Sequence, residues 1–170
     1  KMSNNPSISG GKAGARVVRT GLIGCEILAS RSPWLHECEG AALGLDLRYT
    51  LFDFSALGRT GADLERQLQE AEAAGFAGLN ITYPFKQTVI QYLDDLSDAA
   101  RLVGAVNTVH FTGGKRIGFN TDVTGFAASL KAGLVDAAMG RVLQFGCGGA
   151  GSATAHALLQ SGVGTLLLSD

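Results

Sequence analysis

A glycine-rich segment near the carboxyl end of the sequence is the feature that most restricts the fold. Its glycines Gly146, Gly148 and Gly151 satisfy the pattern G-x-G-x-x-G. The segment follows an apolar run at 142–145 that predicts a strand, and it precedes residues 152–160, which predict a helix. A strand, a glycine turn and a helix in this order are typical of the βαβ unit that opens a dinucleotide-binding domain. We therefore expect the start of a Rossmann-type domain at 141–170.

The same segment predicts how a dinucleotide would bind. The first glycine permits a tight turn, the second lets the backbone approach a pyrophosphate, and the third allows the helix to pack closely on the strand. Gly149 and Ala150 complete the loop, where the helix start offers unpaired N–H groups and a partial positive charge. Asp170 follows the next predicted strand, at 165–168, and lies 19 positions after Gly151. A carboxylate there binds ribose hydroxyls and repels a 2′-phosphate, so NAD is favoured over NADP.

The residues before this unit predict a second α/β domain, over 16–132. Apolar and alternating runs predict strands at 16–23, 47–52, 76–81, 105–111 and 116–121. Helices are expected at 32–44, 60–75, 86–92, 97–103 and 122–132. The sheet should be mixed but mainly parallel. Residues 133–140 form the best domain boundary, and residues 1–15 are expected to form a tail or loop.

Four local signals set the expected helix starts. Ser32 should cap a helix that has proline in its first turn, and Asp122 should cap another. Thr60 and Asp63 resemble a capping box. Pro84 should begin a helix directly after a strand, which would put Lys86 in the first turn of that helix.

Composition restricts the possible partners and compartments. The net charge is −1 and 17% of the 170 residues are charged, which gives no electrostatic case for nucleic acid or a membrane surface, so we expect a small-molecule ligand. The polar start has no apolar signal region, and no apolar run reaches the length of a membrane span. The three cysteines and three histidines lack metal-ligand spacing, which predicts reduced thiols, a cytoplasmic protein and no metal site. A first residue other than methionine and an end directly after a strand suggest part of a longer protein.

Four polar segments fall at the ends of predicted elements. They are Ser30-Arg31-Ser32-Pro33, Asn80 to Lys86, Ala105-Val106-Asn107-Thr108 and Asn120-Thr121-Asp122. Each has an ordinary structural explanation when it is taken alone. A lysine at a helix start is usually solvated, serine and aspartate serve as caps, and asparagine serves turns. Only the combination points to a site at the carboxyl ends of the strands, where ligands bind in open α/β sheets.

Together with the glycine loop, these segments resemble the shikimate dehydrogenase family and its quinate/shikimate dehydrogenase relatives. The resemblance runs from Leu22 to Asp170 and includes Gly104-Ala105-Val106-Asn107-Thr108 and Gly118-Phe119-Asn120-Thr121-Asp122 followed by Gly125-Phe126. It implies two α/β domains around a cleft. It also implies the reversible NAD(P)-dependent oxidation of a ring hydroxyl of shikimate, to 3-dehydroshikimate, or of quinate, within aromatic amino acid biosynthesis.

The resemblance also implies residue roles. Ser30 and Ser32 would bind the substrate carboxylate, Thr82, Asn107 and Asp122 would contact ring hydroxyls, and Lys86 and Asp122 would form the catalytic pair. Removing hydride from a secondary alcohol requires a base within hydrogen-bond reach of its hydroxyl. Burial would favour neutral Lys86 as that base, whereas a neighbouring carboxylate would favour the ammonium, which could polarise the ketone in the reverse direction.

The sequence departs from the family at four positions near the site. Glu26 and Ala29 stand where a proline and a histidine are usual, Glu37 replaces an asparagine, and Tyr83 stands where a small aliphatic residue is common. These departures indicate a divergent branch and leave shikimate and quinate both open as substrates. Two other functions stay open, namely a non-catalytic shikimate- or quinate-binding sensor and a related two-domain enzyme acting on another small acid. Monomer and homodimer are both compatible with the sequence.

Overall fold

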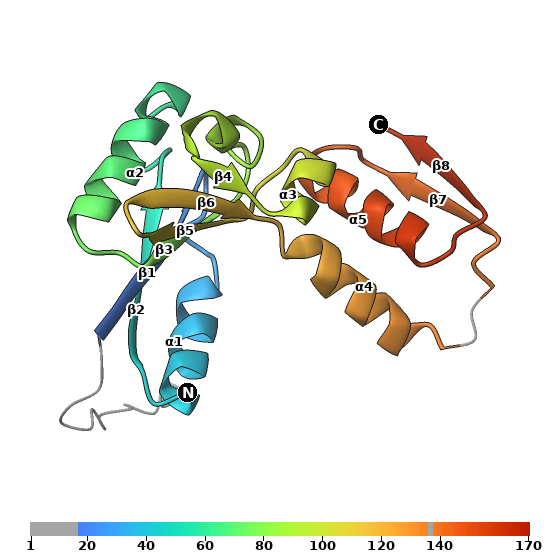
Figure 1. The fold of residues 1–170 in the computed structure, drawn as a ribbon, viewed down its shortest axis with the longest axis horizontal. Helices are drawn as coiled ribbons and strands as arrows, with labels where there is room; N and C mark the ends of the chain where they lie inside the picture. The colour runs from blue at the N-terminus through green and yellow to red at the C-terminus, as the bar shows by residue number, and fades with distance from the viewer. Residues whose placement is uncertain (1–16, 136–137) are drawn as a thin grey trace, which may run out of the picture.

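The computed structural model describes residues 17–135 and 138–170, so the expected tail at 1–15 and part of the 133–140 loop lie outside the described residues. The strands are β1 (Val17–Gly24), β2 (Asp46–Asp53), β3 (Gly78–Ile81), β4 (Asp95–Leu96), β5 (Thr108–Thr112), β6 (Lys115–Phe119), β7 (Arg141–Phe145) and β8 (Thr165–Ser169) (Figure 1). The α-helices are α1 (Ser32–Ala42), α2 (Leu64–Ala73), α3 (Asp98–Val103), α4 (Asp122–Gly133) and α5 (Gly149–Gln160), and two short 3-10 helices are η1 (Gly61–Asp63) and η2 (Thr88–Tyr92). Of the helices in these residues, none combines the length and the apolar character that crossing a bilayer would need.

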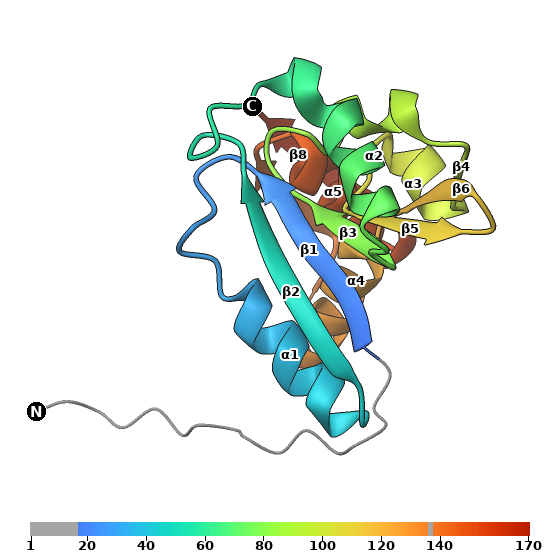
Figure 2. The same cartoon turned by 90° about the vertical axis from the view of Figure 1, so that its left-hand side faces the viewer.

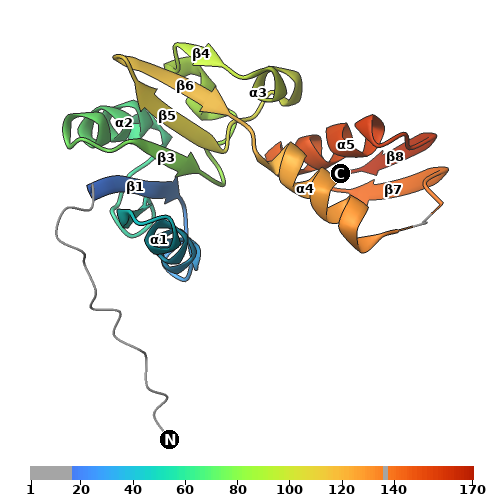
Figure 3. The same cartoon turned by 60° about the horizontal axis from the view of Figure 1, so that its bottom comes forward.

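A six-stranded mixed sheet forms the larger part of the fold, with strand order β2-β1-β3-β5-β6-β4. The pairings β1–β2, β1–β3 and β4–β6 are parallel, whereas β3–β5 and β5–β6 are antiparallel. The expected α/β class with a mainly parallel mixed sheet is therefore confirmed. Figure 3 shows this sheet beside a separate unit that contains β7 and β8.

The two faces of the six-stranded sheet bury different sets of side chains. On one face, Leu22 and Tyr49 belong to a small apolar cluster on the side of α1, which packs along the edge strand β2 (Figure 2). Gly40 of α1 lies so close to Leu47 that an added Cβ would be 2.5 Å from the Leu47 Cβ, which explains the small residue in that helix. On the other face, Ile23 belongs to the main core beneath α2, with Leu64 and several other residues. Both faces are covered, as expected for parallel strands.

A second unit consists of β7, α5 and β8, in which β7 and β8 pair in parallel to form a two-stranded sheet. It is joined to the rest of the chain through packing of α4 on α5 (Figure 1). Val123, Ala153 and Ala157 form the centre of that contact and are buried together with Val103 and Ala105. The predicted βαβ unit is thus present, and α4 leads from the larger sheet into it.

The segment after β3 differs from the prediction. Pro84 follows a cis peptide bond and does not begin a helix, and Lys86 lies in a turn before η2 rather than in the first turn of a helix. The reason is visible in the backbone hydrogen bonds. The Lys86 carbonyl accepts from the Val106 N–H at 2.7 Å, which ties this turn to the start of the β5 segment instead of to a helix.

Two predicted helix caps are wrong. Arg31 is the residue before α1 and Thr121 is the residue before α4, and neither of these two residues makes a side-chain cap hydrogen bond. Ser32 and Asp122 are instead the first helical residues, and their side chains point to other partners. The capping box of Thr60 and Asp63 is confirmed, with the Thr60 N–H donating to the Asp63 carboxylate at 2.8 Å.

Some strand limits also differ. The strand expected at 105–111 begins only at Thr108, and the one expected at 76–81 begins only at Gly78. The two-residue strand β4 was not predicted, because two residues are too few to show any periodicity.

Candidate active site at one edge of the sheet

The predicted site residues gather at one edge because of the strand directions. Strands β1, β3 and β6 run parallel to one another, and β5 runs opposite to β3 and β6. The segments that follow β1, β3 and β6 and the segment that precedes β5 therefore meet at the same edge. These segments carry Ser30, Thr82, Lys86, Asp122 and Asn107.

Lys86 and Asp122 form the centre of this edge. Lys86 Nζ lies 2.6 Å from Asp122 Oδ2, and the two side chains are 18% and 34% exposed. Asn107 Nδ2 donates to the other carboxylate oxygen, Oδ1, at 2.8 Å. A charged hydrogen bond that is partly shielded from water is stronger and better ordered than one on the surface. The structure thus brings together three of the predicted residues in one hydrogen-bonded group.

Asn120 fixes the position of Asp122. Its side chain is buried, its Nδ2 donates to the Ala105 carbonyl at 2.9 Å, and its Oδ1 accepts from the Asp122 and Val123 N–H groups at 3.1 and 3.4 Å. Asn120 therefore satisfies the first N–H groups of α4, and this frees the Asp122 carboxylate to turn toward Lys86.

Thr82 lies at the end of β3, where its backbone N–H donates to the Ile23 carbonyl at 3.0 Å. Its methyl group packs against Gly24, at which an added Cβ would be only 2.4 Å from Thr82 Cγ2. Its hydroxyl makes no hydrogen bond with the residues that the structure describes. Gly24 therefore allows Thr82 to sit beside the end of β1 with a hydroxyl available to a ligand.

Ser30 and Ser32 form a pair at the amino terminus of α1. Ser30 Oγ donates to Ser32 Oγ at 3.0 Å and accepts from the Ser32 N–H at 3.2 Å. Two hydroxyls beside the positive end of an 11-residue helix suit an anion such as a carboxylate. No hydrogen bond among the described residues joins this pair directly to Lys86 or Asp122.

A buried carboxylate holds the loop that carries this serine pair. Asp53, at the end of β2, is 3% exposed and accepts from the N–H groups of Glu26, Ile27 and Leu28 at 2.7–3.1 Å. It also accepts from two N–H groups after β2. Burial alone would raise the pKa of Asp53, but these backbone hydrogen bonds together lower it below its ordinary value. The charged form of Asp53 therefore fixes the loop between β1 and α1.

The glycine loop has the geometry that its sequence predicts. Gly146 has a φ of +93°, and a Cβ on Gly151 would lie 2.2 Å from the Gly146 carbonyl oxygen, so both positions require glycine. Gly148 precedes α5, and nothing lies within 4 Å of the position a Cβ would take there. The loop thus leaves open space at the amino terminus of α5, which fits a pyrophosphate. Gly148 and Ala150 are exposed.

Two contacts connect the glycine loop with its surroundings. Asp170 Oδ1 accepts from the Cys147 N–H at 2.8 Å, so the carboxylate lies beside the loop, where a ribose would be expected. Gly149 lies against Lys86, since a Cβ on Gly149 would be 3.3 Å from the Lys86 Cβ. The loop therefore meets the Lys86–Asp122 pair at the aliphatic stem of Lys86.

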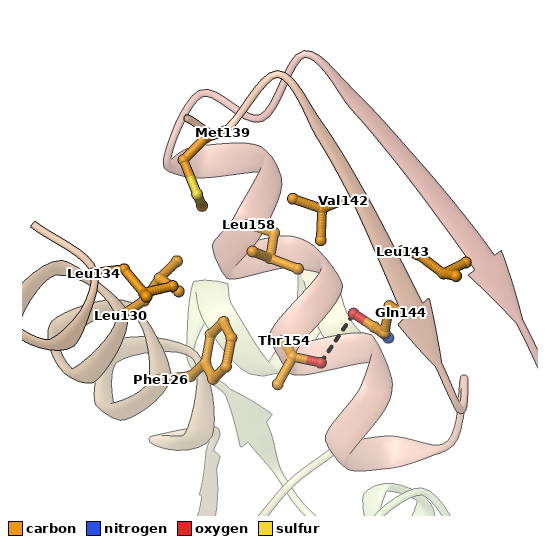
Figure 4. A pocket seen from close by; sticks show the side chains of 9 residues that line it. All are labelled: Phe126, Leu130, Leu134, Met139, Val142, Leu143, Gln144, Thr154 and Leu158. Atoms are coloured by element: carbon orange, nitrogen blue, oxygen red, sulfur yellow. Dashed lines mark hydrogen bonds between the residues drawn. The ribbon is translucent and has the colours of Figure 1, made fainter. Parts of the chain in front are cut away.

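A separate apolar groove of about 290 Å³ lies between α4, α5 and β7. Figure 4 shows its lining, in which Phe126 and Leu130 from α4 face Leu158 from α5, and Thr154 donates to Gln144. None of the predicted site residues lines this groove. Among residues 17–135 and 138–170, no cluster of three acidic, histidine or cysteine side chains could hold a metal ion.

Sequence reasoning missed several residues that contact the site. Tyr49 donates to Asn80 Oδ1 at 2.7 Å, and Thr108 donates to Asn107 Oδ1 at 3.1 Å. Glu37, one of the departures noted in the sequence, accepts from the Tyr49 N–H at 3.0 Å and so links α1 to β2. Polar residues on three different strands lie on the same covered face of the sheet. The sequence of a single strand does not show that these residues are neighbours.

Comparison with known proteins agrees with this geometry. Residues 22–109 match the family described as the shikimate dehydrogenase substrate binding domain. A shikimate dehydrogenase (NADP(+)) of Streptomyces avermitilis is 51% identical over 150 residues, which cover 88% of this chain and 52% of that protein. The chain thus spans about half the length of the curated relatives it matches.

Solved structures show the same relationship. The quinate dehydrogenase from Corynebacterium glutamicum in complex with NAD has a TM-score of 0.83 at 41% identity, over 90% of this chain and 55% of that one. The shikimate 5-dehydrogenase from Thermus thermophilus in complex with NADP(H) and shikimate has a TM-score of 0.77 at 34% identity, over 89% and 56%. The family profile covers more than half of the chain, and the chain therefore belongs to the shikimate dehydrogenase family.

Proposed function

We propose that the intact protein is an NAD(P)-dependent dehydrogenase that reversibly oxidises a ring hydroxyl of shikimate or quinate. One observation carries this proposal, namely the contact between the glycine loop and the hydrogen-bonded Lys86–Asp122 pair, with Gly149 against the Lys86 side chain. Dehydrogenation of an alcohol needs a hydride acceptor and a proton acceptor on the same carbinol group. The two parts that would supply them are adjacent in this chain.

The open space at Gly148, the positive end of α5 and the Asp170 carboxylate suit a dinucleotide, whose nicotinamide supplies the hydride acceptor when it is bound. Lys86 and Asp122 take the proton of the ring hydroxyl as its carbon becomes a carbonyl, and they return it in the reverse direction. Ser30 and Ser32 hold the substrate carboxylate. Thr82 and Asn107, together with Asp122, hold the ring hydroxyls.

The domain arrangement belongs to the same proposal. Residues 16–132 form the substrate-binding domain, and residues 141–170 form the first βαβ unit of the NAD(P)-binding domain. Cys25, Cys38 and Cys147 form no disulfide, which supports a reducing compartment, and we place the enzyme in the cytoplasm.

The test is a panel of shikimate and quinate with NAD and with NADP, added to the intact protein while nicotinamide absorbance is recorded. Reduction of either cofactor by shikimate or quinate is expected, with NAD preferred because of Asp170. Binding of these acids without reduction would instead favour a sensor. Activity only with other small acids would favour a related dehydrogenase.

A further inference from the structure

A row of polar side chains crosses the sheet on the face covered by α1. Tyr49 on β2 donates from its hydroxyl to Asn80 Oδ1 on β3 at 2.7 Å. Asn80 Nδ2 donates to Thr108 Oγ1 at 3.1 Å, and these two residues are direct partners in the β3–β5 pairing. The row thus begins at a tyrosine that is 8% exposed and reaches the strand that starts beside the candidate site.

The row continues into the Lys86–Asp122 pair. The Thr108 hydroxyl donates to Asn107 Oδ1 at 3.1 Å, and Asn107 Nδ2 donates to Asp122 Oδ1 at 2.8 Å. Lys86 Nζ occupies the other oxygen of the same carboxylate at 2.6 Å. An unbroken series of hydrogen bonds therefore connects Tyr49 with the two residues proposed to transfer the proton.

The direction of the series is determined at the Asp122 end, and the Tyr49 end is compatible with it. Burial raises the pKa of Tyr49 to about 12, with the nearby Ser32 side chain opposing part of the shift, so the phenol keeps the proton that it donates to Asn80 Oδ1. At the other end, the Asp122 carboxylate can only accept. An asparagine accepts at its oxygen and donates at its nitrogen, so each asparagine in between has one permitted orientation. Reversing Asn107 would turn its oxygen toward the Asp122 carboxylate and its NH₂ toward the Thr121 N–H, and reversing Asn80 would turn its oxygen toward the Asn107 carbonyl.

We propose that Tyr49, Asn80 and Thr108 are positioning residues, which orient Asn107 and, through it, the carboxylate of Asp122 toward Lys86. This inference rests on the proposed dehydrogenase function. Proton transfer needs the reacting groups at hydrogen-bond distance and in line, and a site held by a second layer of hydrogen bonds keeps that geometry. The Thr121 N–H also donates to Asn107 Oδ1 at 3.0 Å, so losing the series should weaken the orientation rather than abolish it.

The first experiment compares Thr108→Val with Thr108→Ser in the intact protein. Valine keeps the shape and strand preference of threonine but removes the hydroxyl, whereas serine keeps the hydroxyl. We expect Thr108→Val to lower kcat by about tenfold, and Thr108→Ser to stay within about twofold of the wild type. The melting temperatures and the dissociation constant for the substrate carboxylic acid should change little in both variants.

The second experiment removes the other end of the series with Tyr49→Phe, which keeps the ring stacked on His36. If the residues act as one unit, the double variant Tyr49→Phe/Thr108→Val should lose no more kcat than the more impaired of the two single variants. Tyr92→Phe is the matched control, because the Tyr92 hydroxyl makes no hydrogen bond within the described residues.

The outcomes separate this inference from the function on which it rests. A wild-type protein that oxidises neither shikimate nor quinate would overturn both. If the wild type is active, either of two results with the variants would overturn the positioning role alone. The first is a Thr108→Val variant as active as Thr108→Ser. The second is a loss of kcat that follows the melting temperature or is reproduced by Tyr92→Phe.

Discussion

The polar edge belongs to a sheet that is well buried, whereas the glycine loop belongs to a sheet that is largely exposed. The strands behind the edge have covered faces, with residues such as Ile23 and Ile81 fully enclosed in the main core. The loop instead lies on a two-stranded sheet whose outer face exposes Leu143 by 56% and Phe145 by 77%. Two strands alone are marginally stable in water. In this chain the proposed proton-transfer pair therefore lies at the edge of a sheet with two covered faces, whereas the glycine loop depends on α5 and its packing against α4.

The largest expected effect concerns the proposed proton transfer by Lys86 at the edge of the six-stranded sheet. Lys86→Met keeps the stem that packs against Gly149 but removes the ammonium from Asp122, so kcat of the intact enzyme should fall by about 10²- to 10⁴-fold. Lys131→Met, on the exposed surface of α4, serves as the control and should leave kcat unchanged. Steady-state kinetics with shikimate and quinate measure both variants. Undiminished turnover by Lys86→Met would remove Lys86 from the mechanism.

Hydrogen exchange of the 170-residue chain measures the difference in local stability between the two sheets. Amides at the centres of β1 and β3 should exchange at least about 100-fold more slowly than those of β7 and β8, because exchange reports the local free energy of opening. Mass spectrometry of peptides from 17–24, 78–81, 141–145 and 165–169 gives the values. Equal protection in all four would mean that the two sheets open together and do not differ in local stability.

The sequence predicted the parts of the fold that depend on residues close to one another in the chain. The glycine loop between β7 and α5 was found because its three glycines have separate backbone requirements, of which the structure shows the +93° φ of Gly146 and the close contact of Gly151. The α/β class followed from apolar runs of ordinary length. The segment at Pro84 was mispredicted, because the pairing of Lys86 with Val106 that determines it joins residues 20 positions apart.

The candidate site was only partly predictable for the same reason. Lys86, Asn107 and Asp122 were chosen by resemblance, and the structure joins them, but their roles remain predictions. Ser32 and Asp122 were both expected to cap helices, but the Ser32 hydroxyl pairs with Ser30, and the Asp122 carboxylate bonds to the distant residues Lys86 and Asn107. Tyr49 lies in the strand expected at 47–52, and the alternating pattern of that strand predicts no hydrogen-bonding role for it. Its hydroxyl bonds to Asn80 because β2 and β3 lie on either side of β1, an arrangement that no local pattern predicts.

A smaller effect is expected at the glycine loop, where a dinucleotide is proposed to bind. Gly151→Ala would place a Cβ 2.2 Å from the Gly146 carbonyl oxygen, so the loop must move, and dinucleotide affinity should fall by about 10- to 100-fold. Gly125→Ala in α4 is the matched control, because nothing lies within 4 Å of its added Cβ. Calorimetric titration of the intact protein measures both. Substrate affinity without cofactor should stay the same in both variants, and a parallel loss would show that the two sites are not supported independently.

The smallest expected effect concerns the buried carboxylate that supports the serine pair. Asp53→Asn puts an NH₂ group among backbone N–H donors and removes the charge they stabilise, which should lower the melting temperature of the chain by about 4 °C at neutral pH. Because the pKa of Asp53 is lowered in the folded state, its contribution is present above the unfolded pKa of about 4 and is lost as the pH falls further. The difference in melting temperature between wild type and Asp53→Asn should therefore shrink in acid.

Asp46→Asn on the same strand is the control. It removes only an exposed pair with Arg48 and should change the melting temperature little at any pH. A difference between wild type and Asp53→Asn that persists unchanged at pH about 3 would show that the effect is steric and does not depend on the carboxylate charge.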